Sequence, residues 1–414
     1  MSFSHNKKRF LDLIKKKNNF IFYKKLRKFK YDPIPDCIDI IEDNNYSFLY
    51  ESVEKGKDKG RYSICGYKSI KTIQIKNQSQ KLKKRNLSNS ALNINFQDID
   101  ETINKFKFKK NNKLPPMSGA FFGYISYENI NNVENISKLK KRNLLKTPDL
   151  ILFIPEILII YDNINKSLFI LKHIIFDRTR RTIYENILTE LNEIENKLRK
   201  PKKEKSFNLN KVKKLNIKSN ITKSKFLKNI KKAKKYIKDG DIFQVVTSQR
   251  FEINYKEKAS DLYKVLRLTN PSPFMYYFNL PKFKIVGSSP EILVRVRSNS
   301  ITIRPIAGTR PRGKNKQQDK KNEKDLLSDK KEISEHLMLL DLGRNDVGKV
   351  AKKSTISVTS KFIIEKYSHV MHIVSNVNGV LKNNVSPMDA LMAGFPAGTV
   401  SGAPKIRAMQ IIDE

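Results

Sequence analysis

The stretch FLKNIKKAKKYIKDGDIFQVVTSQRF (Phe226–Phe251) decides the fold class, because it sets a helical pattern directly before a strand pattern. Its first half has the i, i+4, i+7 and i+11 apolar spacing of an amphipathic helix, carried by Phe226, Ile230, Ala233 and Ile237. Asp239-Gly240 is a typical helix end. The second half, DIFQVVTSQRF, is rich in strand-forming residues and puts Gln244, Val246 and Ser248 on one face. The sequence therefore predicts a mixed α/β or α+β architecture.

The same two patterns continue on either side of this stretch. Apolar spacing predicts helices over 181–198 and 329–342, and strands over 284–286, 292–296 and 301–306. The longest apolar run, LILFIPEILIIY (Leu150–Tyr161), also contains a predicted strand and is too short to span a bilayer. A lysine-rich stretch at 196–220 predicts a linker between an N-terminal region, 20–195, and a C-terminal region, 221–414. A second basic stretch, 76–89, predicts a surface loop.

The large positive charge of the chain does not by itself indicate a nucleic-acid partner. The 414 residues include 83 Lys+Arg and 41 Asp+Glu, a formal net charge of +42. Only 18 of the basic residues are arginine, the residue favoured for bidentate contacts with phosphates and bases, so we expect no nucleic-acid partner. Two cysteines cannot form a disulfide framework. No secretory signal or membrane span is evident, and we expect a cytoplasmic protein.

Two carboxylates in the predicted helix 329–342 are candidates for metal binding. Glu332, Glu335 and His336 fall at i, i+3 and i+4 and so share one helical face. Mg²⁺ commonly takes one or two protein carboxylates and completes its shell with water and substrate. A solvated face paired with Lys330 and Lys331 is the other interpretation, and spacing alone leaves both open.

A third carboxylate, Glu291, follows the turn in GSSPEILVRV (Gly287–Val296). A rigidly held carboxyl there suits a general acid, although such a residue can also be an ordinary surface turn residue. In ITIRPIAGTRPRG the backbone of Gly308 and Thr309 could bind an anion, with Arg310 and Arg312 as further donors.

Two histidines and a glycine-rich loop complete the candidate residues. His369 and His372 in YSHVMHIVS share a face in a helix and point oppositely in a strand, and a single catalytic imidazole fits better than zinc. AGFPAGTVSGAPKIRAM (Ala393–Met409) is a glycine-rich loop that leads into a helix and lets a ligand approach the backbone closely.

Seven of these segments occur together in the order of a known family. They are DIFQVVTSQRF, NPSPFMYY, GSSPEILVRV, IRPIAGTRPRG, SEHLMLLDLGRND, YSHVMHIVS and FPAGTVSGAPK, with a weaker N-terminal match at YESVEKGKDKGRYSICG. The chain thereby resembles the chorismate-utilising enzymes, and among them the large components of anthranilate synthases. The resemblance implies a large α+β fold of two subdomains with antiparallel sheets flanked by helices.

The resemblance also implies a reaction and its residues. Chorismate and ammonia would give anthranilate and pyruvate with Mg²⁺ as cofactor, the ammonia coming from a glutamine amidotransferase subunit. Glu335 would bind Mg²⁺ with Glu332 as support, and Glu291 would be the general acid. Gly308 and Thr309 would bind substrate, and His372 would be a catalytic-site histidine.

Two positions distinguish subgroups within the family. Gln244 stands where isochorismate and salicylate synthases carry a water-activating lysine, which favours ammonia as the nucleophile. Ala307 stands where aminodeoxychorismate synthases, the alternative assignment, usually carry a nucleophilic lysine, and alanine cannot form that covalent intermediate.

The resemblance further implies feedback inhibition by tryptophan. Glu51 and Ser52 would bind its ammonium and carboxylate groups, and Pro273, Phe274 and Met275 would line the indole pocket. Ordinary turn and strand-end roles are the alternative.

Members of this family extend beyond the position that matches Glu414. The further stretch carries a tyrosine, an arginine, a glycine-rich loop and a second Mg²⁺-binding glutamate. From the resemblance we expect a 414-residue chain without that stretch to be catalytically inactive.

Overall fold

The computed structural model describes residues 2–53, 60–75, 91–109, 111–136, 145–176, 184–199 and 215–414. The predicted loop at 76–89, residues 200–214 of the predicted linker and residues 181–183 of a predicted helix lie outside these ranges. The chain divides into two compact units. Unit 1 comprises Met1–Ser126, Asn143–Asn208 and Glu257–Pro290, and unit 2 comprises Tyr127–Arg142, Leu209–Lys256 and Glu291–Glu414. Each unit thus collects segments from both sides of the lysine-rich stretch at 196–220.

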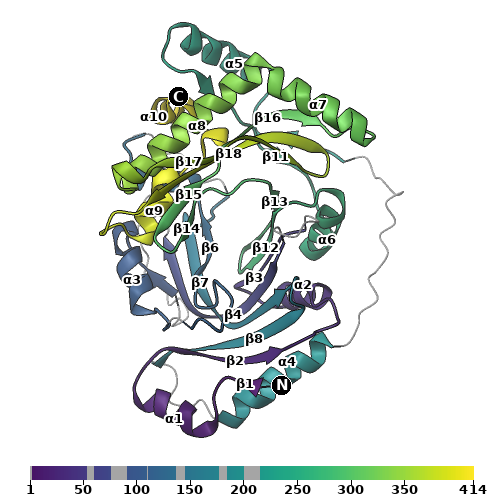
Figure 1. The fold of residues 1–414 in the computed structure, drawn as a ribbon, viewed down its shortest axis with the longest axis vertical. Helices are drawn as coiled ribbons and strands as arrows, with labels where there is room; N and C mark the ends of the chain where they lie inside the picture. The colour runs from purple at the N-terminus through teal and green to yellow at the C-terminus, as the bar shows by residue number, and fades with distance from the viewer. Residues whose placement is uncertain are drawn as a thin grey trace. The chain divides into compact units, whose positions relative to one another are not determined.

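Unit 1 is built on one large sheet (Figure 1). Among the described residues it has ten strands in the order β1 (Ser2–Phe3), β2 (Phe20–Leu26), β8 (Ser167–Ile174), β7 (Leu150–Asp162), β4 (Tyr62–Ile75), β3 (Ser47–Glu51), β12 (Phe274–Leu280) and β13 (Phe283–Ser289), with β5 (Ala91–Asn93) beside β4 and β6 (Phe122–Ile125) beside β7. All pairs are antiparallel except β4 with β5. Its helices are α1 (Lys7–Lys15), α2 (Ile34–Asp43), α3 (Ile99–Lys105), α4 (Tyr184–Leu198) and α6 (Ala259–Thr269), with a short 3₁₀ turn, η1 (Phe96–Asp98).

The apolar run of β7 explains how this sheet is buried. Ile157 and Ile159 pack in a core that includes residues of α2, α4 and α6, whereas Leu158 and Ile160 pack in a second core on the opposite face. A strand covered on both faces needs no polar alternation, which accounts for the continuous LILFIPEILIIY pattern. Pro155, which has no N–H to donate, lies opposite an irregularity in the pairing with β4.

Unit 2 has a smaller antiparallel sheet with helices against it. The strands run in the order β14 (Arg295–Arg297), β15 (Ser300–Ile303), β18 (Val370–Val380) and β16 (Ile306–Pro311), and β17 (Ser357–Lys366) also pairs with β18. Two short pairs join β10 (Gln244–Val245) to β19 (Gly402–Ala403) and β11 (Phe251–Glu252) to β9 (Lys218–Ser219). The helices are α5 (Lys223–Lys238), α7 (Lys316–Ser328), α8 (Lys330–Val350), α9 (Pro387–Gly394) and α10 (Lys405–Asp413), with 3₁₀ turns η2 (Tyr127–Asn132), η4 (Lys353–Thr355) and η5 (Gly398–Val400).

Helix α8 lies along the sheet of unit 2 and forms its core (Figure 1). Leu340 and Val347 are buried against Ile301, Ile303 and Val377 of the strands. The helix runs eight residues beyond its predicted end at Leu342, and the glycine that follows Leu342 has a packing role. A Cβ at Gly343 would lie 3.0 Å from Pro305 Cγ, so glycine lets the helix approach the sheet closely.

These elements confirm the α+β fold with antiparallel sheets flanked by helices and correct several predicted strands. DIFQVVTSQRF forms only the short strand β10 and, at Phe251, the start of β11. Phe243 is 77% exposed, and β10 pairs with the two-residue strand β19 instead of entering the sheet. The predicted strand 292–296 is reduced to β14. The predicted strand 301–306 is divided at Arg304-Pro305 between β15 and β16, since proline cannot donate a ladder hydrogen bond. Among the described residues, no helix combines the length and apolarity needed to cross a membrane.

Replacing Leu340 tests the role of α8 in the core of unit 2. Leu340 is 3% exposed, so Leu340→Ala should lower the free energy of unfolding by about 2–5 kcal/mol through lost burial and a residual cavity. Leu337 on the same helix is 45% exposed, and Leu337→Ala should change stability by less than about 0.5 kcal/mol. Urea denaturation of both variants measures the difference. Equal destabilisation by the two substitutions would contradict this account of the core.

Candidate functional site

The candidate residues of unit 2 gather around the first turns of α8. Glu332 and Glu335 lie one turn apart on that helix. Asp329 caps the helix by accepting hydrogen bonds from the N–H groups of Lys331 and Glu332, which fixes where the first turn begins. Strand β16 supplies Gly308 and Thr309, β18 supplies His372, and β10 supplies Gln244.

A bulge in β16 turns its backbone toward these carboxylates. The register between β16 and β18 shifts between Ala307 and Thr309, and Gly308 takes a φ of 77°. A side chain at Gly308 would be strained by this conformation and would press on Ile373, which explains the glycine. At the bulge the N–H of Thr309 donates to Glu332 Oε2 at 3.2 Å.

The same bulge sets the tautomer of His372. Its Nδ1 lies 3.1 Å from the carbonyl oxygen of Gly308 and 3.0 Å from Thr309 Oγ1. A carbonyl oxygen can only accept, so Nδ1 carries the proton, and in the neutral imidazole Nε2 is the acceptor. The strand β18 also decides which of the two histidines belongs to the site. His369 lies exposed before the strand begins, whereas His372 lies within the strand and reaches the site.

Glu335 is held by an amide. Gln244 Nε2 donates to Glu335 Oε1 at 3.0 Å, while Gln244 Oε1 is buried without a hydrogen-bond partner. Glu332 is shared between Thr309 and Arg310, whose Nη1 is 3.7 Å away.

This donor set fits a cation that needs few protein ligands. Among the described residues, no three His, Cys, Asp or Glu side chains converge to form a metal-binding group. Two carboxylates at adjacent turns and an unsatisfied amide oxygen beside them are all hard oxygen donors, and Mg²⁺ is commonly held by one or two carboxylates with water and substrate oxygens. The arrangement therefore fits Mg²⁺ and does not fit zinc.

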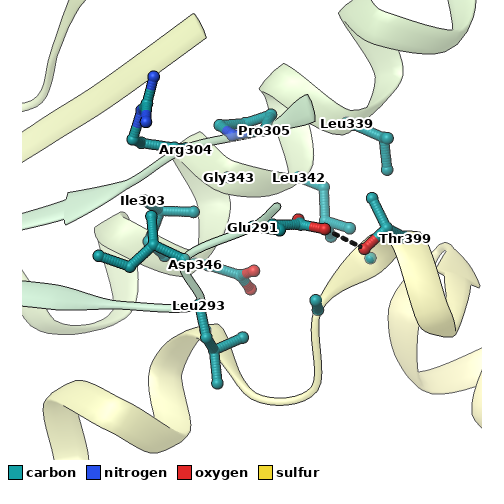
Figure 2. A pocket seen from close by; sticks show the side chains of 14 residues that line it. Glu291, Leu293, Ile303, Arg304, Pro305, Leu339, Leu342, Gly343, Asp346 and Thr399 are labelled. Atoms are coloured by element: carbon teal, nitrogen blue, oxygen red, sulfur yellow. Dashed lines mark hydrogen bonds between the residues drawn. The ribbon is translucent and has the colours of Figure 1, made fainter. Parts of the chain in front are cut away.

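Glu291 lies between β13 and β14, in a small cavity beside later turns of α8 (Figure 2). The cavity, about 30 Å³, is lined by Glu291, Asp346, Thr399 and apolar groups of α8, and it is large enough to hold water. Thr399 Oγ1 donates to Glu291 Oε2 at 2.8 Å. Burial raises the pKa of the Glu291 carboxyl above its ordinary value, although the hydrogen bond from Thr399 opposes this shift. A carboxyl that retains its proton is what a general acid requires.

Three other residues that the sequence analysis singled out, Arg310, Arg312 and Ala307, are ion-paired or packed within unit 2. Arg310 binds Asp325 and Asp329 at 2.5 and 2.7 Å, and Arg312 binds Asp319 at 2.7 Å, so neither guanidinium is the free anion donor expected from the sequence. Ala307 is buried in β16 opposite Ile373.

His336 does not share the polar face expected for it with Glu332 and Glu335. The imidazole is fully buried, its Nε2 lies 2.7 Å from Ser375 Oγ, and its ring packs beside Phe362. Burial lowers the pKa of His336 to about 4, so it is a neutral core residue near pH 7.

The five residues expected to bind tryptophan are neighbours in unit 1. Strands β3 and β12 pair with Met275 opposite Glu51, and the N–H of Val53 donates to the carbonyl of Ser272 at 3.2 Å. This pairing brings Glu51-Ser52 beside Pro273-Phe274-Met275. Met275 is buried and Phe274 is 38% exposed.

Glu51 is already bound within unit 1. Tyr263 Oη donates to Glu51 Oε1 at 2.6 Å and Arg267 Nε donates to the same oxygen at 2.9 Å. Burial raises the pKa of Glu51, and the Arg267 charge opposes that shift. Glu51, Ser52 and Arg267 line a cavity of about 950 Å³ together with Phe29 and Tyr161.

Sequence reasoning missed four polar residues that support these sites: Tyr263 and Arg267 beside Glu51, and Thr399 and Asp346 beside Glu291. Thr399 and Asp346 lie within quoted motifs, yet nothing in their spacing points to Glu291, because the contact depends on how two loops meet.

Comparisons with known proteins agree with one another. The family described as chorismate binding enzyme matches residues 45–414. Anthranilate synthase component 1 of Cereibacter sphaeroides is 40% identical over 408 residues, which cover 96% of this chain and 80% of that protein. The protein of the same name from Acetivibrio thermocellus is 41% identical over 379 residues, covering 90% and 76%.

Solved structures give the same result. Anthranilate synthase component I of Streptococcus pneumoniae TIGR4 superimposes with a TM-score of 0.71 at 32% identity, covering 87% of this chain and 79% of that one. The menaquinone-specific isochorismate synthase MenF of Escherichia coli, at 14% identity and a TM-score of 0.66 over 98% and 82%, shares the fold.

The buried His336 predicts a specific acid sensitivity. Its pKa is about 4 in the folded chain and about 6.5 when unfolded. Between those values the unfolded chain binds a proton that the folded chain does not, so stability falls as pH falls from 6.5 to 4, by up to about 3 kcal/mol. Urea unfolding at a series of pH values should show a shallower decline for His336→Leu than for the unsubstituted chain. The exposed His369→Leu should leave the decline unchanged, and identical slopes for all three proteins would disprove the assignment.

Proposed function

This chain belongs to the chorismate binding enzyme family, and we propose that it is the large component of an anthranilate synthase. In this proposal chorismate and ammonia are converted to anthranilate and pyruvate, the first step of tryptophan biosynthesis. The observation that carries it is the match of about nine-tenths of the chain, at 40–41% identity, to proteins named anthranilate synthase component 1. The amide of Gln244 bound to Glu335 supports the same subgroup.

Glu291 is the proposed general acid. Chorismate carries an unactivated hydroxyl at C4, and its departure as water requires a proton. Glu291, whose partly buried carboxyl has a pKa raised by desolvation, would donate that proton, and the hydrogen bond from Thr399 would fix its orientation.

Mg²⁺ is the proposed cofactor. When bound, it would supply positive charge to anchor a substrate carboxylate. Glu335 would hold it, with Glu332 one turn away. Gln244 orients Glu335 by donating to one of its oxygens and leaves the other for the ion.

The bulge of β16 is the proposed substrate-binding turn. Gly308 and Thr309 would contact chorismate through the bulged backbone, and His372, with its proton on Nδ1, would face the substrate with Nε2. The glycine is required there by its positive φ.

Two side chains favour ammonia as the nucleophile over water or an enzyme lysine. Gln244 has no basic group to activate water, whereas ammonia is nucleophilic without such a base. Ala307 cannot form a covalent intermediate, which argues against an aminodeoxychorismate synthase, the alternative assignment.

A second component and an inhibitor complete the proposal. A glutamine amidotransferase subunit would supply ammonia, and the name component 1 of the relatives supports a partner of some kind. Tryptophan would bind at Glu51, Ser52, Pro273, Phe274 and Met275 in the region 20–195 and the adjoining β12, and region 221–414 would be catalytic. The location would be the cytoplasm, and the lysine-rich surface would not serve nucleic-acid binding.

Calorimetric titration with chorismate tests the site. Chorismate should bind in the presence of Mg²⁺ and at least about tenfold more weakly after chelation or in Glu335→Gln, because the ion anchors a carboxylate. The matched control is Glu323→Gln, which removes an α7 carboxylate that pairs with Lys366 of β17. This variant should bind chorismate normally. Binding that is indifferent to Mg²⁺ would contradict the metal assignment. Any product formed with ammonium salts should be fluorescent anthranilate, and isochorismate or aminodeoxychorismate would overturn the subgroup.

Thermal unfolding with and without tryptophan tests the inhibitor site. A ligand that binds only the folded chain stabilises it, so about 1 mM tryptophan should raise the midpoint by a few degrees. Phe274→Ala should abolish the shift without loss of core packing, because Phe274 is partly exposed. Leu268→Ala, at an exposed position on α6, should retain the shift. No shift in the unsubstituted chain would remove tryptophan from the proposal.

A further inference from the structure

The ammonium group of Lys405, at the start of α10, is buried in unit 2 and has no role in the proposed chemistry. Its Nζ donates to Asp346 Oδ2 at 2.6 Å and to the carbonyl oxygen of Gly394 at 3.2 Å. Lys405 is 7% exposed and Asp346 4%. Burying a lysine ammonium costs several kcal/mol before its partners offset it, so the chain retains an expensive arrangement at this point.

These two contacts tie together the ends of one loop, residues 395–404 between α9 and α10. Gly394 is the last residue of α9 and Lys405 the first of α10. The bond from Lys405 Nζ to Gly394 O therefore closes the loop across its base, and the bond to Asp346 anchors that base to α8. The loop also lies against α8 at Gly398, where a Cβ would come within 2.4 Å of Leu342.

One side of the 395–404 loop holds Glu291. Thr399 donates to Glu291 at 2.8 Å, as Figure 2 shows, and Ser401 Oγ braces the turn by donating to the carbonyl of Ala397 at 2.8 Å. The position of the Thr399 hydroxyl is thus set by the loop and not by a helix or a sheet.

The other side of the loop holds Gln244. Strand β19 pairs with β10, with Ala403 opposite Gln244, and the N–H of Val246 donates to the carbonyl of Ser401 at 2.9 Å. A Cβ at Gly402 would lie 2.1 Å from the carbonyl oxygen of Gln244, so glycine permits this approach. Gln244 in turn donates to Glu335. A single loop therefore contacts the general-acid carboxylate directly and the metal-site carboxylate through one amide.

Charge compensation of Asp346 does not account for Lys405. Lys349, 46% exposed on α8, already places its Nζ 3.6 Å from Asp346 Oδ1. Among the described residues, Lys405 and not Lys349 donates to the carbonyl oxygen of Gly394.

We propose that Lys405 is a positioning residue, which ties the base of the 395–404 loop to α8 so that Thr399 and Gln244 meet Glu291 and Glu335. The inference rests on the roles proposed for those two glutamates. Loss of the tie should loosen the loop while the α8 core stays folded.

Hydrogen–deuterium exchange tests the tie without reference to activity. Lys405→Met should speed exchange of amides within 395–404 by at least about tenfold and leave amides of the α8 core unchanged, because local opening then costs less free energy. Lys349→Met, which removes the other lysine near Asp346, should change the loop by less than about twofold. If Lys405→Met does not fold, the neutral pair Asp346→Asn/Lys405→Met leaves no unpaired buried charge and should show the same loosening. Unchanged loop protection in a folded variant lacking Lys405 overturns the proposal.

A double-mutant cycle tests whether the tie acts through Thr399. Chorismate affinity is measured for Lys405→Met, Thr399→Val and the combination. If Lys405 positions Thr399, the combined loss should be smaller than the product of the two separate losses, whereas independent structural damage should multiply. Multiplicative losses overturn the link to Thr399. Absence of chorismate binding by the unsubstituted chain would refute the proposed function, and the exchange experiment would still decide the role of Lys405.

Discussion

The packing of α8 on the sheet of unit 2 determines the candidate site. A helix turns by a constant angle per residue, so one buried stripe fixes the direction of every other side chain. Leu340 and Val347 form that stripe, and Gly343 allows close contact with Pro305. Glu332 and Glu335 then face β16 and β10, and later turns of the same helix line the cavity of Glu291. One hydrophobic contact therefore places the two α8 glutamates and one wall of the cavity that holds Glu291.

Two carboxylates that line this cavity, Glu291 in the loop between β13 and β14 and Asp346 on α8, have different neighbours. Glu291 is partly buried and accepts a hydrogen bond from a neutral hydroxyl, and the cost of desolvating its charge raises its pKa. The pKa of Asp346 is also raised by burial, but the ammonium of Lys405 opposes that shift. The same type of side chain thus has a hydroxyl as its partner in one place and an ammonium group in the other.

Local signals predicted much of this molecule, and non-local ones account for the errors. The helices α5 and α8 follow from apolar spacing, and Thr309 lies within hydrogen-bonding distance of both His372 and Glu332. The long strand expected over DIFQVVTSQRF was wrong because the pairing partner of Gln244 is Ala403 in the 395–404 loop, 159 residues later in the chain. Arg310 and Arg312 seemed to be anion donors only because their aspartate partners on α7 and at the start of α8 could not be foreseen.

The net charge of +42 is another property whose meaning depends on contacts that the sequence does not show. The net charge is a property of the surface as a whole. The three lysines that are buried among the described residues, in contrast, each pair with specific carboxylates: Lys24 with Glu195, Lys172 with Glu156 and Glu190, and Lys405 with Asp346. Composition cannot separate these lysines from the many exposed ones, because all carry the same formal charge. Burial separates them, since an ammonium withdrawn from water must be matched by its immediate neighbours. The neighbours of Lys405 are the carboxylate of Asp346 on α8 and also the carbonyl oxygen of Gly394 at the end of α9. Because of this second bond, the ion pair connects the base of the 395–404 loop to α8 as well as neutralising a charge.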